Sequence, residues 1–280
     1  MQYNSTELMT VVASRILKNS DVCFVGIGLP SAACNLARLT HAPDITLIYE
    51  SGTIQTKPDV LPLSIGDGEL CETALTTVSV PEMFSYWLQG GRITVGFLGG
   101  AQIDKFGNIN TTVVGDYHKP KVRLPGGGGA PEIAAFCHTI YVIMKQSPRA
   151  FVDKVDFITS FGHGDGPGQR KAMGLNTSGP SKIITDLCIM ETEEATGEFI
   201  VTSIHPGVAR ETIQENTGWK IRFAGEVATT DAPTLQELEA LRVLNEKTKM
   251  AHQAKIPCRK FLFARLSAVP SDAMGGVCQG

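Results

Sequence analysis

Apolar residues along this chain follow two patterns, one typical of helices and one typical of short buried strands. The helical pattern is clearest where Leu235, Leu238, Leu241 and Leu244 recur three residues apart, which places them on one side of a helix. The pattern predicts helices at residues 6–17, 32–39, 81–89 and 233–249, and strands at residues 21–25, 44–50, 92–98, 139–144, 157–160, 182–185 and 199–204.

The order of these elements predicts the fold. Residues 21–50 read as strand, glycine turn, helix and strand, a βαβ unit that implies neighbouring parallel strands and a right-handed crossover. Ser31 is the expected N-cap of the helix at 32–39. Because no internal repeat or low-complexity linker interrupts the pattern, we expect one domain over residues 1–250. Residues 251–280 are irregular and partly basic, and we expect a tail that is loosely ordered or packed on a partner.

Composition narrows the class of protein. The chain has 280 residues, 42% of them hydrophobic, which is enough for a large core, and no apolar run approaches the roughly 18 residues of a membrane span. It begins without a basic segment followed by an apolar one, so secretion is not expected. A net charge of -3 favours small molecules or proteins over nucleic acid as partners. Its seven cysteines include no C-x-x-C pair, which argues against zinc and disulfides and for a cytoplasmic protein.

Glu50 is the first candidate for chemistry. It ends the predicted strand at 44–50, and Ser51-Gly52 breaks the chain directly after it. In an open α/β sheet, ligands bind at the carboxyl ends of the strands. A carboxylate there can serve as a nucleophile, a base or a ligand, although a glutamate at a strand end is also common as a plain surface residue.

Two glycine-containing turns are the second feature. Gly126 to Gly129 are four consecutive glycines between prolines, and without Cβ atoms their N–H groups can approach a phosphate or an oxyanion closely. Gly26 and Gly28 form half of a dinucleotide-binding fingerprint, but its third glycine is replaced by Ser31. A dehydrogenase is therefore disfavoured, and the same turn can supply N–H groups to an oxyanion.

Polar residues between these turns are candidates for binding an anionic ligand. Gln102 follows a predicted strand and a glycine pair, and its amide is suited to a ligand contact. His118, Lys119, Lys121 and Arg123 form a basic stretch that leads directly into the glycine run. A basic stretch is usually a solvated face, but here its position fits an anionic substrate or the phosphates of coenzyme A.

Taken in order, these motifs resemble the B subunit of family I coenzyme A transferases. The resemblance rests on Gly-Ile-Gly-Leu-Pro at 26–30, Glu-Ser-Gly at 50–52, Gly-Ala-Gln-Ile-Asp at 100–104 and Gly-Asn-Ile-Asn at 107–110, followed by Gly-Asp-Tyr at 115–117 and the glycine run. It spans about residues 6 to 250 and is more specific than any one motif. It implies an α/β fold with an open, mainly parallel sheet and helices on both faces.

The resemblance also implies roles for particular residues. Glu50 falls on the family's nucleophilic glutamate, which carries CoA as a covalent glutamyl-CoA thioester. The backbone N–H groups expected to hold the oxyanion are those of Ile27, Gly28, Gly128 and Gly129. The residues expected to bind substrate or CoA are Gln102, Lys119, Lys121, Arg123, Gly126 and Gly127. No metal and no permanently bound cofactor is implied, since the CoA thioester is itself a substrate.

The family resemblance also implies a partner and a substrate class. The active site of the family forms between an A and a B subunit, so we expect an A partner and an α2β2 heterotetramer. Glu-Ser-Gly at 50–52 is the variant of the glutaconate-type branch, which favours a dicarboxylate. The first expectation is transfer from succinyl-CoA to 3-oxoadipate, a step of aromatic compound catabolism. Glutaconate with acetyl-CoA, and an acyl-CoA decarboxylase or hydrolase on the same fold, are the alternatives.

Overall fold

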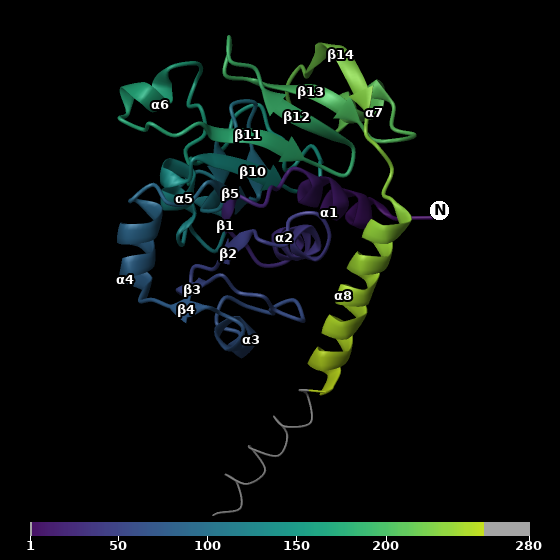
Figure 1. Cartoon of the computed structure of the whole chain (residues 1–280). Coiled ribbons are helices and arrows are strands. Elements are labelled where there is room, and N and C mark those ends of the chain that lie inside the picture. The colour runs from purple at the N-terminus through teal and green to yellow at the C-terminus, as the bar shows by residue number, and fades with distance from the viewer. Residues whose placement is uncertain (1, 255–280) are drawn as a thin grey trace, which may run out of the picture.

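A ten-stranded sheet forms the centre of the molecule (Figure 1). The computed structural model describes residues 2–254. In sheet order the strands are β14 (Arg222–Thr229), β13 (Phe199–Ile204), β12 (Cys188–Thr192), β11 (Gly179–Ile184), β10 (Thr139–Ile143), β5 (Val95–Leu98), β1 (Val22–Phe24), β2 (Thr46–Ile48), β3 (Thr53–Ile54) and β4 (Thr76–Thr77). The strands from β11 to β2 pair in parallel, while β12, β3 and β4 add antiparallel pairs. The predicted open, mainly parallel sheet is confirmed.

Helices cover both faces of this sheet. On one face α1 (Ser5–Arg15) and α2 (Leu29–Leu39) pack on the strands, and the long helix α8 (Leu235–Ala254) lies against both of them (Figure 1). On the other face α5 (Ala130–Phe136) packs on β5 and β11. The alternation of strand side chains produces the two layers, because Cys23 and Leu47 point to one face while Phe24 and Ile48 point to the other.

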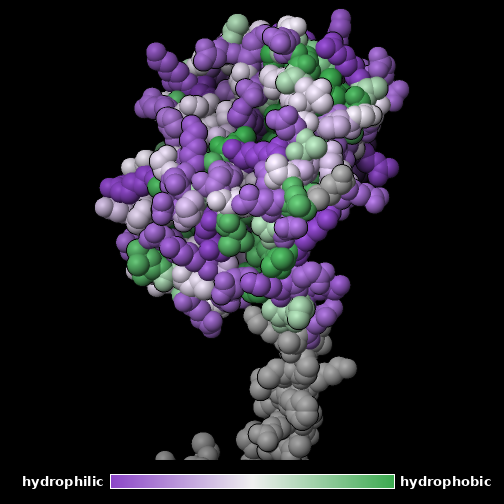
Figure 2. Space-filling model, turned by 45° about the vertical axis from the view of Figure 1, so that its right-hand side comes forward, coloured by the Kyte–Doolittle hydropathy of each residue, from purple (hydrophilic) through white to green (hydrophobic). Residues whose placement is uncertain are grey.

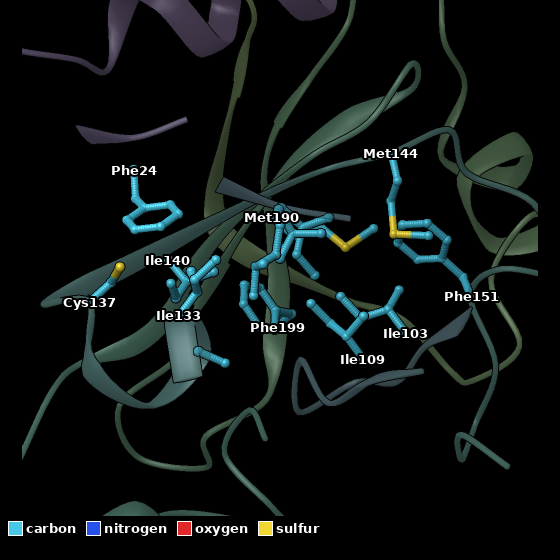
Figure 3. Close-up of a cluster of buried hydrophobic side chains, with 14 of the residues drawn as sticks. Phe24, Ile103, Ile109, Ile133, Cys137, Ile140, Met144, Phe151, Met190 and Phe199 are labelled. Carbon is cyan, nitrogen blue, oxygen red and sulfur yellow. The ribbon is translucent and has the colours of Figure 1, made fainter. Parts of the chain in front are cut away.

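The larger core cluster fills the face that carries α5. Figure 3 shows Phe24, Ile133 and Ile140 at one side of this cluster and Met144 and Phe151 at the other, with Phe199 between them. The small sheet of β6 (Gln102–Ile103) and β7 (Ile109–Asn110) closes it from below through Ile103 and Ile109.

Shorter elements complete the chain. They are α3 (Gly68–Glu72), α4 (Val80–Glu82), a π-helix at Met83–Leu88, the hairpin of β8 (Val113–Gly115) and β9 (Pro120–Arg123), α6 (Gln169–Ala172) and α7 (Arg210–Glu215). On the side of the molecule shown in Figure 2 the surface is mainly hydrophilic, with apolar side chains in small separate patches. No helix within residues 2–254 combines the length and the apolar character needed to cross a bilayer.

The element predictions were correct for most of the sheet and wrong in particular places. The predicted helix at 81–89 is α4 followed by the π-helix. The predicted strand at 157–160 is wrong, since there only Ser160 forms a single bridge, with Ile109. Strands β3, β4, β12 and β14 of the large sheet were not predicted. Ser31 is not the N-cap of α2, which begins at Leu29 after Gly28; its hydroxyl instead bonds the Tyr49 hydroxyl at 2.8 Å.

The predicted tail begins inside a helix. Residues 251–254 continue α8, which runs four residues beyond the expected end of the domain. The rest of the predicted tail lies outside the described residues.

Candidate active site

The carboxyl ends of the parallel strands meet at one edge of the sheet, and Glu50 lies there. Strands β1 and β2 pair in register, and the Val25 N–H donates to the Ile48 carbonyl at 2.8 Å, which extends this pairing to the edge. Glu50 follows β2 and the Gly26–Gly28 turn follows β1, so the two segments leave the sheet next to each other. Glu50 thus lies where α/β folds bind ligands, as the sequence predicts.

The turn after Glu50 requires glycine at position 52. Gly52 has a φ of +102°, and a Cβ there would lie 2.0 Å from the Val78 carbonyl oxygen. Its N–H donates to Tyr49 and its carbonyl accepts from Val78, each at 2.9 Å. Tyr49 is fully buried, which raises the pKa of its hydroxyl. A buried residue before Glu50 and a glycine turn after it therefore hold the carboxylate at the edge of the sheet.

Glu50 lines an open hollow of about 380 Å³. The other walls come from Phe84 and Ser85 of the π-helix, Gln89 just after it, Gly128 and Gly129 of the glycine run, and Glu132 of α5. Helix α5 packs directly against the π-helix, so the two walls are held together.

Gly129 is in contact with the predicted nucleophile. A Cβ at this position would lie 2.8 Å from Glu50 Oε1 and 2.6 Å from Phe84 Cζ. Within the described part of the chain, no group accepts a hydrogen bond from the N–H of Gly127, Gly128 or Gly129. Backbone donors without a partner lie beside the carboxylate, which is the arrangement that stabilises an oxyanion.

The glycine run is anchored at both ends. Its first member, Gly126, has a φ of +101° and donates to the Thr111 carbonyl at 2.9 Å. Thr159 Oγ1 accepts from the Thr111 N–H at 2.9 Å and bonds the Thr112 hydroxyl at 2.7 Å, and its methyl group packs on Gly127. At the other end the run passes into α5. Contacts at both ends therefore hold the loop in this conformation.

The first glycine turn lies beside this hollow and does not line it. Gly28 has a φ of +88° and precedes α2, and it borders a separate hollow of about 350 Å³ shared with Thr10 and Leu241. Among the described residues, none accepts a hydrogen bond from the N–H of Ile27 or Gly28. Their assignment as oxyanion donors stays a prediction.

Gln102 lies in a structural network. It is buried, its Nε2 donates to Asp156 Oδ2 at 2.9 Å, and its Oε1 accepts from Asn110 Nδ2 at 2.7 Å. Asp156 Oδ2 also accepts from the Gly115 N–H at 2.9 Å. This network ties β6 and β7 to the hairpin of β8 and β9. Gln102 therefore has a structural role here, in contrast to the free amide that the sequence suggested.

The predicted cations are exposed on the same hairpin. Asp116 Oδ1 accepts from the N–H groups of His118 and Lys119, an Asx turn that forms the tip. Lys121 and Arg123 project from β9, and the Arg123 guanidinium lies 5.1 Å from the Tyr117 ring. None of the three predicted cations lines the hollow around Glu50.

A π-helix occupies Met83–Leu88, where the sequence predicts a helix of unspecified type. The Gln89 N–H bonds the Phe84 carbonyl at 2.8 Å, a link between residues five apart that defines this helix type. The sequence signal was only a helical pattern at 81–89, which does not distinguish the two helix types. Ser85, Gln89 and Glu132 are therefore functional candidates that only the structure revealed.

Comparison with known proteins agrees with this geometry. A family model described as Coenzyme A transferase matches residues 6–216. The chain belongs to the coenzyme A transferase family. Over 250 residues, 89% of this chain and 96% of the relative, it is 67% identical to the B subunit of 3-oxoadipate CoA-transferase from Pseudomonas knackmussii. A second relative is the B subunit of glutaconate CoA-transferase from Acidaminococcus fermentans, 37% identical over 86% of this chain and 91% of that protein.

The fold of this CoA transferase chain also matches a solved relative. The crystal structure of glutaconate coenzyme A-transferase from Acidaminococcus fermentans superposes with a TM-score of 0.81 at 32% identity, covering 86% of this chain and 94% of that one. Both named relatives are B subunits, so this CoA transferase chain is a B-type subunit. A B subunit of a two-subunit enzyme implies an A-subunit partner. Within the described residues, no three His, Cys, Asp or Glu side chains are grouped as a metal site would require.

Proposed function

We propose that this B-type chain moves CoA from succinyl-CoA to 3-oxoadipate through a glutamyl-CoA thioester on Glu50. The observation that carries the proposal is the contact of Glu50 with Gly129, beside N–H groups that have no partner among the described residues. The substrate rests on the relative that is 67% identical and is named for 3-oxoadipate.

The first half of the reaction transfers CoA to the enzyme. A carboxylate oxygen of Glu50 adds to the thioester carbonyl, and collapse of the adduct breaks the C–S bond, leaving a succinyl-glutamyl anhydride and CoA thiolate. The thiolate then adds to the glutamyl carbonyl and succinate leaves with the electrons of the anhydride C–O bond. The enzyme now carries CoA as a thioester, so the energy of the original thioester is conserved.

The second half repeats these steps in reverse order. A carboxylate of 3-oxoadipate adds to the glutamyl thioester and thiolate leaves. The thiolate then attacks the 3-oxoadipyl carbonyl of the new anhydride and restores Glu50. No proton or redox equivalent is gained or lost, and each tetrahedral adduct places a negative oxygen where the N–H groups of Gly128 and Gly129 can bind it.

The A subunit has a defined task in this proposal. The hollow around Glu50 is open, and an anhydride exposed to bulk water would hydrolyse. A partner that covers the hollow excludes this water, and two copies of the pair form the proposed α2β2 assembly. Lys119, Lys121, Arg123, Gly126 and Gly127 are proposed to contact the anionic parts of the substrates from the neighbouring hairpin and loop.

Intact mass spectrometry tests the proposal. This chain is co-purified with its A subunit and mixed with succinyl-CoA, and each chain is weighed. The expected result is a CoA thioester on this chain, mapped to the peptide that contains Glu50 and discharged by 3-oxoadipate. Glu50→Gln should abolish the adduct, whereas Glu82→Gln, an exposed carboxylate on α4 outside the hollow, should retain it. An adduct that survives in Glu50→Gln would contradict the proposal.

A further inference from the structure

The π-helix changes which side chains face Glu50. In an α-helix, side chains five residues apart point about 140° away from each other. Here the hydrogen bond between Gln89 and Phe84 stacks these two residues, and both line the hollow together with Ser85. Leu88, in contrast, is buried in the core. The unusual winding therefore brings two polar side chains to a wall of the hollow next to the glycine run, and π-helices are frequently found at functional sites.

The charges of the hollow restrict what these side chains can bind. Its charged lining residues are Glu50 and Glu132, both acidic, and no lysine or arginine of the described chain lines it. Gln89 Nε2 donates to Glu132 Oε2 at 3.5 Å, and both residues line the hollow, so the amide nitrogen lies at this wall and keeps a second N–H. A second substrate carboxylate at this wall would be repelled by Glu132, whereas a neutral oxygen can accept from a neutral N–H or O–H donor.

A 3-oxo acid carries such an oxygen at a fixed place. Its ketone carbon is two bonds from the carbonyl carbon that Glu50 attacks, so the ketone enters the hollow whenever the acyl group is in position to react. The distal carboxylate of a six-carbon acid is five bonds away and can extend out of the hollow. The neutral ketone would thus lie at the wall that carries Gln89 and Ser85, while the charged distal carboxylate would lie away from Glu132.

We infer that Gln89, assisted by Ser85, is a specificity-determining residue that donates a hydrogen bond to the ketone oxygen of a 3-oxo acid. The inference rests on the proposed function and adds to it the side chain by which the enzyme would distinguish 3-oxo acids from analogues without the ketone. Glu132 positions the Gln89 amide and keeps the distal carboxylate away from this wall. Since Gln89 is exposed in the isolated chain, the A subunit would have to exclude water from the contact.

Measuring the two half-reactions separately distinguishes recognition of the ketone by Gln89 from a general loss of catalytic activity. Succinyl-CoA has no ketone, so in Gln89→Met, paired with the A subunit, the glutamyl-CoA adduct should form at the wild-type rate. Discharge of that adduct by 3-oxoadipate should slow about tenfold or more, because a bound ketone would lose its donor. Discharge by adipate, which lacks the ketone, should be the same in variant and wild type. Adduct formation also shows that the variant is folded.

A matched substitution elsewhere serves as the control. Gln236→Met changes the same side chain on α8, where it is exposed and borders a different hollow, and it should alter neither half-reaction. Ser85→Ala should reproduce the ketone-dependent loss in weaker form. Equal slowing for 3-oxoadipate and adipate in Gln89→Met, or no slowing for either acid, would overturn the inference.

The inference can fail independently of the proposed function. If the wild-type pair forms no adduct, the proposed mechanism is wrong, and Gln89 is then tested by calorimetry with 3-oxoadipyl-CoA and adipyl-CoA. A preference for the 3-oxo compound that disappears in Gln89→Met would support the role of Gln89. Equal loss of affinity for both compounds, or no loss, would contradict it.

Discussion

Glu50 and Gly129 are packed so closely that a Cβ on Gly129 would lie 2.8 Å from Glu50 Oε1. The two residues are far apart in the chain, one after β2 and the other before α5, and the fold brings them into contact. The absence of a side chain at position 129 is therefore a requirement of the site and not only a source of loop flexibility.

Gly129→Ala should impair catalysis more than folding. The new methyl group would displace both the Glu50 carboxylate and the Phe84 ring, and disturbing one oxyanion donor typically costs about 100- to 1,000-fold in rate. Overpacking should lower the free energy of unfolding by only about 1–3 kcal/mol. Steady-state kinetics of the two-subunit enzyme and urea unfolding would measure both effects.

Gly225→Ala is the control for this substitution, because a Cβ at Gly225 on β14 has no neighbour within 4 Å. It should leave the rate unchanged. A fully active Gly129→Ala enzyme would refute the close approach described for this loop.

Glu50→Asp should shift the balance from transfer to hydrolysis. The shorter side chain keeps a nucleophilic carboxylate but withdraws the anhydride from the donors of the glycine run, where water can compete with the thiolate. The measurement is the ratio of 3-oxoadipyl-CoA formed to CoA released in one assay. An unchanged ratio would mean that the length of this side chain does not protect the intermediate.

Thr159→Val should loosen the glycine run. Valine has the shape of threonine but cannot accept from the Thr111 N–H, and a donor left without a partner costs about 1–3 kcal/mol. The rate of adduct formation should fall together with the free energy of unfolding. Thr159→Ser, which keeps the hydroxyl, should restore most of both, and failure of serine to do so would show that the methyl contact with Gly127 matters more.

Asp104 should make stability depend on pH. Burial raises the pKa of this carboxyl to about 6 from its ordinary value of 3.8, although hydrogen bonds from Asn108 and Phe106 favour the ionised form. Between these values the folded state holds a proton that the unfolded state has released. The free energy of unfolding should therefore fall as pH rises through this range, by up to about 3 kcal/mol in total.

Urea unfolding of the isolated chain between pH 4 and 7 would measure this slope. Asp104→Asn cannot ionise and should lose this contribution, even though its amide would face Asn108 and lower stability at every pH. Asp153→Asn, at an exposed position, should keep the wild-type profile. A slope that persists unchanged in Asp104→Asn would assign it to other groups.

Local sequence patterns predicted the strands correctly where a run of apolar residues is compatible with only one structural environment. Within the predicted strands at 21–25 and 92–98, the apolar residues Val22–Phe24 and Val95–Leu98 form central strands, because a stretch without polar side chains is stable only when it is buried on both faces. The run at 157–160 looked similar, but its apolar residues Phe157 and Ile158 are exposed, and only Ser160 forms a bridge, with Ile109.

Hydrogen-bond partners could not be predicted in the same way. Ser31 had the sequence context of an N-cap and instead bonds Tyr49, and Gln102 looked available to a ligand but is held by Asp156 and Asn110. Each polar side chain has several possible partners, and which one it meets depends on contacts between segments far apart in the chain.

The sequence by itself determined the family, the parallel sheet and the placement of Glu50 at a strand end before a glycine turn, because these features depend on local pattern and order. Only the tertiary structure decided which glycine run touches Glu50, and that Ser85, Gln89 and Glu132 share its hollow. The reason is physical: the π-helix is stabilised by packing against α5, and contacts between such distant segments leave no local signal in the sequence.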